Sequence, residues 1–341
     1  MASSETGDCL ASTYFCQFEA DRWGKSFLFT ADFSIIIVSP WFDEPSLFSS
    51  WNPVLFSNSN YTHNLPIRSV YRPSPFGEFP FHWVESGVGD EYVVFLHGIM
   101  AHSMAFRCVL ESSARRFRVI VPDLPGHGRD RTFESDVISP SLDGLLRWLE
   151  GFLDTIGDDA PIHLVGHSLG ATLGYLAALN PERYPSVSSL TLVSPGLEIR
   201  VPPWTGSLVG KLPARLARLG ITRAGVRLYE PLQWRRARMT DREISDYLHP
   251  IRQLHRIRYI LGIGSDLVDQ TGSIDEASNI DLRSLIIWGD SDHLLPLPTA
   301  HRLHEAIPDA RLEIFENCGH CPMEDCPTDF HDVLSQFLIN H

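Results

Sequence analysis

Short, mostly apolar runs recur along the chain, and polar or turn-forming residues separate them. Their positions are 92–96, 118–121, 162–165, 189–193, 284–288 and 311–315. A run of four or five such residues is typical of a strand that is buried in a sheet. The run at 162–165 is followed by small and apolar residues at 171–179, a helical stretch that stops at Asn180-Pro181. The pattern favours buried parallel strands that alternate with helices.

The interval between the runs at 189–193 and 284–288 is about ninety residues, whereas one helix and its loops need far fewer. Helical periodicity is plausible within it at 206–219, 224–237 and 241–263. Thr240, three residues before Glu243, predicts a capping box at the start of the last of these. We therefore expect a helical insertion at this point of the sheet.

Residues 166–170, Gly-His-Ser-Leu-Gly, follow the run at 162–165 directly. A G-x-S-x-G motif between a strand and a helix is typical of a nucleophile elbow, in which a serine occupies a strained turn and the two glycines remove clashing side chains. The motif alone is weak evidence because it arises by chance. Its context here, a strand before it and a helix after it, is the one that the chemistry requires.

A serine is a poor nucleophile until a base accepts its proton and an acid orients that base. Asp290 and Asp292 follow the run at 284–288, and His320 follows the run at 311–315. Ser, Asp and His thus come at three strand ends, where open α/β sheets carry their sites. Each residue alone is better explained as a turn former or a structural side chain, but their joint placement favours a catalytic triad.

These motifs resemble those of the α/β-hydrolase-fold superfamily, and the resemblance covers roughly residues 67–341. Two further signposts of that family are His97-Gly98 after the run at 92–96 and residues 123–128, Asp-Leu-Pro-Gly-His-Gly, after the run at 118–121. The resemblance implies a doubly wound, mostly parallel, eight-stranded α/β sheet with a helical cap insertion. It also implies an antiparallel start of the sheet at 67–71 and 79–84.

The family's pattern, carried onto this sequence, implies Ser168 as nucleophile, His320 as base and Asp292 as the orienting acid. The family usually writes the acid turn as W-G-x-x-D, which selects Asp292 and leaves Asp290 as the fallback. The resemblance further implies an oxyanion hole from the backbone amides of Ile99 and Leu169. Nothing in this chemistry requires His97, His127 or His167 as proton carriers, so we interpret them as residues that shape loops.

The expected organisation has three parts: an aromatic-rich extension at 1–66, the hydrolase core at 67–197 and 281–341, and the cap at 198–280. In the family such a cap roofs the site and sets substrate choice. Aromatic and apolar residues near the site are candidates for the pocket wall, namely Met104, Phe106, Trp204 and Trp234. The extension holds eight of nineteen Phe and three of eight Trp, so we expect it to pack on the body, extend the cap or form a homodimer contact.

Charge and composition narrow the class of protein. The chain carries a net charge of −14, which argues against a nucleic-acid partner, while residues 198–260 hold thirteen Lys/Arg against five Asp/Glu. We expect most of these cations to face solvent or pair with the acidic body rather than select an anionic substrate. No apolar run is long enough to span a bilayer, and the acidic start does not fit a secretory signal, so a cytoplasmic enzyme is expected.

No cofactor or metal is expected. The cysteines at 318, 321 and 326 bracket His320, but a histidine that holds zinc through one nitrogen could not also move the serine proton. The sequence thus predicts a serine hydrolase that cleaves a small-molecule ester, thioester or lactone through an acyl-enzyme on Ser168. Two alternatives stay open: carbon–carbon cleavage or a biosynthetic cyclisation or lyase step with the same triad, and a non-catalytic binding protein.

Overall fold

The computed structural model describes residues 66–157, 160–199, 204–269 and 274–339, and two earlier strands, β1 (Ser26–Phe29) and β2 (Ile35–Val38). These two strands pair antiparallel, with Ser26 opposite Val38. Residues 1–60 and 61–341 are separate compact units. Apart from the two strands, the predicted extension lies outside the described residues, so its expected contacts stay predictions.

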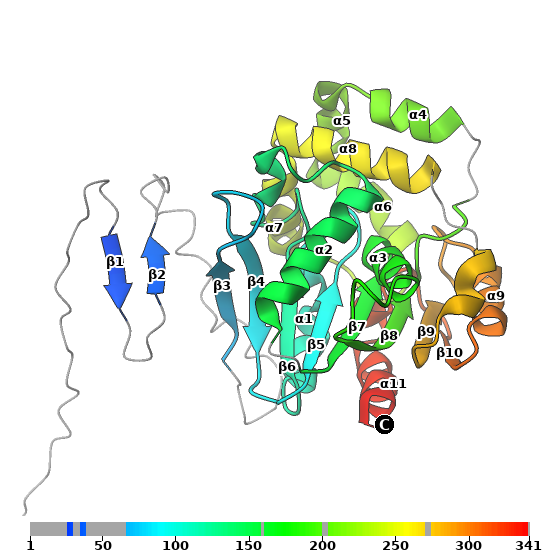
Figure 1. Ribbon diagram of the computed structural model, residues 1–341. Coiled ribbons are helices and arrows are strands. Elements are labelled where there is room, and N and C mark those ends of the chain that lie inside the picture. The colour runs from blue at the N-terminus through cyan, green and yellow to red at the C-terminus, as the bar shows by residue number, and fades with distance from the viewer. Residues whose placement is uncertain are drawn as a thin grey trace, which may run out of the picture. The chain divides into compact units, whose positions relative to one another are not determined.

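The larger unit is built on one eight-stranded sheet, whose order is β10-β9-β8-β7-β5-β6-β4-β3 (Figure 1). β3 and β4 pair antiparallel, β4 and β6 do the same, and all other neighbours are parallel. The strands are β3 (Arg68–Arg72), β4 (Phe81–Ser86), β5 (Tyr92–Leu96), β6 (Arg118–Pro122), β7 (Ile162–His167), β8 (Val187–Val193), β9 (Ser284–Gly289) and β10 (Ala310–Phe315). The predicted doubly wound, mostly parallel sheet is confirmed, including its antiparallel start.

Helices cover both faces of this sheet. Successive side chains of a strand point to opposite faces, so a strand with a continuous apolar run needs cover on both. In β5, Val94 and Leu96 join the core cluster under α2 (Leu142–Ile156) and α3 (Leu169–Ala178). Val93 and Phe95 join the opposite cluster. That cluster packs under α1 (Arg107–Ser113) and α11 (Pro327–Ile339). Strands buried on both faces explain the continuous apolar runs of the sequence.

The structure describes five α-helices between β8 and β9 along the chain. They are α4 (Trp204–Lys211), α5 (Ala214–Gly220), α6 (Arg223–Gln233), α7 (Asp241–Ile251) and α8 (Leu254–Asp269). The helix expected at 206–219 is interrupted before Ala214, where Pro213 has an extended backbone. The helix expected at 241–263 is two helices, α7 and α8. The capping box is confirmed, since Thr240 and Glu243 bond each other's backbone amides.

α8 lies above the sheet in Figure 1, and it approaches the loops that follow β5, β6 and β8. A side chain at Gly126, in the loop after β6, would meet the ring of Tyr259 at 2.7 Å. A side chain at Gly264 would come within 3.6 Å of Ile99, which follows β5, and one at Gly196, after β8, within 3.7 Å of Leu267. The inserted helices therefore lie over the end of the sheet where the motif residues are found.

The chain also contains α9 (Pro298–Ala306) and the short helix α10 (Pro322–Asp325), which follows His320. α9 packs against β9 and β10, and its Ala300 and Leu303 belong to the same core cluster as α2 and α3. No helix among the residues that the structure describes is long and apolar enough to cross a bilayer.

Candidate active site

Ser168 occupies the turn between β7 and α3. Its φ of 51° lies in the left-handed region, which costs free energy for a residue with a side chain. A β-carbon on Gly166 would sit 2.3 Å from the carbonyl oxygen of Gly170, and one on Gly170 would sit 2.1 Å from that of Leu96. These contacts involve backbone atoms, so neither position tolerates a side chain without moving the turn. The strain and the two glycines are the features of a nucleophile elbow.

The loop after β5 passes directly beside this serine. A β-carbon on Gly98 would approach the β-carbon of Ser168 to 3.2 Å. Ile99 follows in the same loop, and Leu169 is the first residue of α3, so its N–H has no partner within that helix. The amides of Ile99 and Leu169 therefore belong to the two segments that flank Ser168.

His320 and Asp292 form a buried pair at the ends of β10 and β9. Nδ1 of His320 donates to Oδ2 of Asp292 at 2.8 Å, and the two side chains are 4% and 0% exposed. Oδ1 of Asp292 accepts from the amides of Leu294 and Leu295 at 2.8 and 3.0 Å. Burial acts to raise the pKa of Asp292, but the neighbouring His320 and these hydrogen bonds outweigh it and lower that pKa. An ionised Asp292 leaves the proton of His320 on Nδ1, with Nε2 as a proton acceptor.

Asp290 has a different environment, although it lies only two residues earlier. Its side chain accepts from the Ser291 hydroxyl at 2.9 Å and from the amide of Cys318 at 3.3 Å. The residue is exposed at the surface. Of the two candidate acids, Asp292 is the one that the structure joins to His320.

His167 connects the serine turn to the histidine loop. Its Nε2–H donates to the carbonyl oxygen of His320 at 2.9 Å, and the two rings lie 4.8 Å apart. Burial, with the neighbouring His320, lowers the pKa of His167 to about 3. A neutral imidazole next to Ser168 thus holds the main chain of His320 close to the elbow.

The other two signpost motifs bond each other. Nδ1 of His97 donates to the carbonyl of Gly98 at 2.8 Å, and its Nε2 accepts from the amide of Leu124 at 3.0 Å. The carboxylate of Asp123 accepts from the imidazole of His82 at 2.7 Å. The same carboxylate leaves no space for a side chain at Gly128, where a β-carbon would lie 2.2 Å from it. Further donors to Asp123 are the amides of Ser103 and Arg129. These bonds fix the loops after β5 and β6 relative to each other.

Asp325 joins the histidine loop to the inserted helices. Its buried carboxylate accepts from the amide of Gly319 at 2.8 Å. It also accepts from three amides just after α6, those of Arg235, Arg236 and Ala237, at 2.7 to 3.0 Å. In the opposite direction, the amide of His320 donates to the carbonyl oxygen of Gln233 at 2.8 Å. The sequence pattern does not predict this joint, because its signal is no more than a pair of acids among apolar and cysteine residues at 318–326.

Glu324, next to Asp325, binds two groups from other segments. It forms an ion pair with Arg107, which also pairs with Glu243 at 2.7 Å. Its second oxygen accepts from the indole N–H of Trp234 at 2.8 Å. Burial raises the pKa of Glu324, against the opposing effect of Arg107. This network ties α1, α7 and the segment after α6 to α10.

The four residues expected at the pocket wall have different surroundings. Trp234 and Phe106 are buried in the core cluster beneath α1 and α11, where Phe106 contacts Phe95 at a ring distance of 4.7 Å. Met104 is buried in the turn before α1. Trp204 begins α4, and its side chain lies outside the described residues. Their contact with a substrate stays a prediction.

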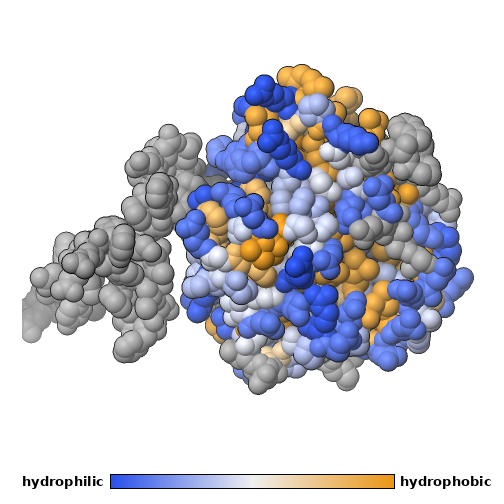
Figure 2. All heavy atoms as spheres, turned by 45° about the horizontal axis from the view of Figure 1, so that its top comes forward, coloured by the Kyte–Doolittle hydropathy of each residue, from blue (hydrophilic) through white to orange (hydrophobic). Residues whose placement is uncertain are grey.

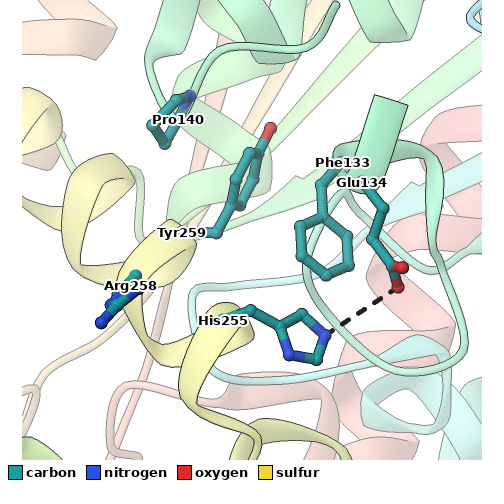
Figure 3. A pocket seen from close by; sticks show the side chains of 6 residues that line it. All are labelled: Phe133, Glu134, Pro140, His255, Arg258 and Tyr259. Atoms are coloured by element: carbon teal, nitrogen blue, oxygen red, sulfur yellow. Dashed lines mark ion pairs between the residues drawn. The ribbon is translucent and has the colours of Figure 1, made fainter. Parts of the chain in front are cut away.

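A separate cavity of about 460 Å³ opens between α8 and the loops around β6 and α2. Figure 3 shows its lining: Phe133, Glu134, Pro140, His255, Arg258 and Tyr259. The rings of Phe133 and His255 stack at 5.6 Å, and Glu134 pairs with His255 at 3.9 Å. None of the triad candidates lines this cavity, so it is distinct from the site at Ser168.

Comparison with known proteins agrees with this architecture. A model of the Alpha/beta hydrolase family matches residues 93–333. A 2-hydroxy-6-oxononadienedioate/2-hydroxy-6-oxononatrienedioate hydrolase of Cupriavidus pinatubonensis is 28% identical over 77% of this chain and 92% of its own length. Monoacylglycerol lipase ABHD6 of Homo sapiens is 26% identical over 73% of this chain and 75% of its own. The solved structure of a serine hydrolase involved in carbazole degradation matches with a TM-score of 0.66 at 23% identity, covering 80% of this chain and 99% of that one.

Proposed function

Because the chain belongs to the alpha/beta hydrolase family, we propose that it hydrolyses a carboxylic ester, thioester or lactone through an acyl-enzyme on Ser168. The observation that carries the proposal is the buried hydrogen bond of 2.8 Å between His320 and Asp292, at strand ends in the same sheet as the strained Ser168. A buried Asp–His pair and a strained serine together have the composition of a catalytic triad.

In the proposed reaction, Nε2 of His320 accepts the hydroxyl proton as Oγ of Ser168 attacks the substrate carbonyl. Asp292 stabilises the imidazolium that forms, and the amides of Ile99 and Leu169 stabilise the oxyanion. Collapse of the tetrahedral intermediate transfers the proton to the leaving group and leaves the acyl-enzyme. Water then attacks the acyl carbon, gives its proton to His320 and releases the acid, and Ser168 regains its proton.

The inserted helices act as a cap in this proposal. α8 lies against the loops that carry Ile99 and Gly126, and the segment after α6 bonds the loop that carries His320. A substrate that reaches Ser168 must therefore pass beside these helices. This position supports the proposal that the insertion selects the substrate. Excluding water from the site strengthens the electrostatic stabilisation of the oxyanion.

The test combines a fluorophosphonate probe with a substrate panel. We expect the probe to label the wild type, with the adduct on Ser168 by mass spectrometry, and Ser168→Ala to lose both labelling and turnover while keeping its thermal stability. The panel holds p-nitrophenyl esters, acyl thioesters, lactones and a 2-hydroxy-6-oxo-dienoate. Undiminished labelling of Ser168→Ala would reject the nucleophile. Turnover of the dienoate alone would replace ester hydrolysis by carbon–carbon cleavage. The Cupriavidus relative is the reason to include this substrate.

A double-mutant comparison tests whether the residues act together. Triad members act as a unit, so Ser168→Ala and His320→Ala should each lower kcat nearly as much as the double variant does. Losses that multiply would show that the two residues contribute through separate mechanisms.

A further inference from the structure

Residues 208–219, in α4, α5 and the turn between them, expose four leucines to solvent. The exposed fractions are 57% for Leu208, 40% for Leu212, 57% for Leu216 and 73% for Leu219. Single exposed leucines are ordinary on protein surfaces. Four within twelve residues are not, because a gathered apolar surface marks a contact with a partner or a membrane.

The same twelve residues carry only positive charge. Lys211, Arg215 and Arg218 are exposed, and residues 208–219 contain no acid. Within the described part of the chain, none of these three cations forms an ion pair. We call residues 208–219 the leucine–arginine surface. These three cations face solvent, which is one of the two outcomes expected for most basic residues of the insertion.

The leucine–arginine surface is the outermost layer of the insertion. α4 and α5 pack on α8, with Ala214 buried. Gly210 lies so close to α8 that a β-carbon there would meet the Ser265 side chain at 2.8 Å. Figure 1 shows α4 and α5 above α8, farthest from the sheet, and Figure 2 shows apolar and strongly polar residues gathered side by side on that end of the molecule. Among the residues that the structure describes, the leucines and cations of this surface are exposed rather than packed on α8.

We propose that the leucine–arginine surface docks onto a lipid bilayer that contains anionic headgroups. Leucine side chains enter the boundary between headgroups and acyl chains, and arginine and lysine remain at the level of the phosphates with their stems in the apolar layer. The leucines of the leucine–arginine surface match the apolar boundary layer, and its cations, with no acid among them, match the layer of phosphates. The net charge of −14 opposes approach to such a membrane, so these cations direct which end of the molecule meets it.

Charge complementarity favours this occupant over the alternatives. A second copy of the chain would bring the same three cations against themselves, because a twofold contact pairs like surfaces. Nucleic acid would use the cations but leave the four leucines without a partner. This inference does not rest on the proposed reaction, since it concerns binding and uses no residue of the triad.

The experiment measures sedimentation of the full-length protein with vesicles of phosphatidylcholine, alone or mixed with phosphatidylserine. We expect binding to the mixed vesicles, weaker binding to phosphatidylcholine alone, and a loss of binding as salt is raised. Arg215→Gln/Arg218→Gln should lower the partition coefficient by roughly 25-fold, since each cation near an anionic surface contributes about fivefold. Leu216→Ser/Leu219→Ser should lower it on both kinds of vesicle.

The matched control is Val88→Ser/Val137→Ser, two valines that are 86% and 51% exposed outside the insertion. This variant should bind like the wild type. Equal loss in the control, or no binding of the wild type to mixed vesicles, would overturn the proposal. A wild-type dimer in size-exclusion chromatography that becomes a monomer in Leu216→Ser/Leu219→Ser would also overturn it, because the surface would then be a contact between copies. Turnover of the ester panel reports separately on the proposed function.

Discussion

Replacing Asp325 by asparagine is the sharpest test of the joint between the inserted helices and the histidine loop. One oxygen of the carboxylate accepts from Gly319 and Arg235, and the other from Arg236 and Ala237. Asparagine keeps one oxygen and puts an NH2 group in place of the other. Either orientation sets a donor against two amide donors, so two of the four hydrogen bonds are lost.

The expected loss follows from these two bonds. A hydrogen bond to a charged acceptor contributes about 1.5 to 3 kcal/mol, so Asp325→Asn should lower the free energy of unfolding by about 3 to 6 kcal/mol. The site is only 6% exposed, so water cannot fully replace the lost acceptor. Against a total stability of about 5 to 15 kcal/mol, this is a large fraction.

The assay is urea unfolding followed by circular dichroism, together with kcat and KM on the best substrate of the panel. Because the Gly319 amide is one residue before His320, kcat should fall more than KM changes in the fraction that remains folded. Asp325→Glu retains the charge and should recover part of both losses. Asp332→Asn is the control, since it makes the same chemical change at an exposed position of α11. A free energy within 1 kcal/mol of the wild type and an unchanged kcat would refute the reasoning.

Three further predictions concern the site and its surroundings. Asp292→Asn should lower kcat by several orders of magnitude and Asp290→Asn by much less, because only Asp292 bonds His320; the reverse ranking in a steady-state assay would move the acid. Gly170→Ala should destabilise the protein by about 2 kcal/mol or more by urea unfolding, whereas Gly220→Ala, where a β-carbon meets nothing within 4 Å, should change stability little. Acidification from pH 6.5 towards 4 should lower the free energy of unfolding, because His102, His127 and His167 have folded pKa values of about 3 to 4 and bind protons in this window mainly when the chain is unfolded. A urea midpoint that stays constant over this window would contradict the assignment to these three histidines.

The local apolar pattern was sufficient to predict six of the eight strands of the large sheet, whereas β3 and β4 were predicted from the resemblance to a known family. The run at 92–96 is β5 residue for residue, since a strand buried on both faces has no polar position inside it. The elbow was predictable because its glycines and serine are adjacent in sequence. The pairing of His320 with Asp292 was predicted from the order of the strands together with the family's W-G-x-x-D acid turn, because local pattern cannot join two residues that are 28 positions apart.

The insertion was harder to predict in detail. Helical periodicity continues through Leu212 and Pro213, although the helix is broken there in the structure. The spacing of apolar residues does not reveal this break, because the chain presents the same side to solvent before and after the turn. The joint at Asp325 left little trace in the sequence, since its donors are main-chain amides that every non-proline residue carries. The four exposed leucines of the leucine–arginine surface were equally hidden, because a leucine at helical spacing predicts burial.

The joint at Asp325 also bears on how the insertion can vary between related chains. The groups that Arg235, Arg236 and Ala237 offer to Asp325 are all main-chain N–H groups, and Gln233 holds the amide of His320 through its carbonyl oxygen. Side chains at 235 to 237 can therefore diverge while the register of the histidine loop stays fixed. Proline is the exception, because it has no N–H to donate. In the proposed function, the insertion that selects the substrate can therefore change its side chains without moving the main chain around His320.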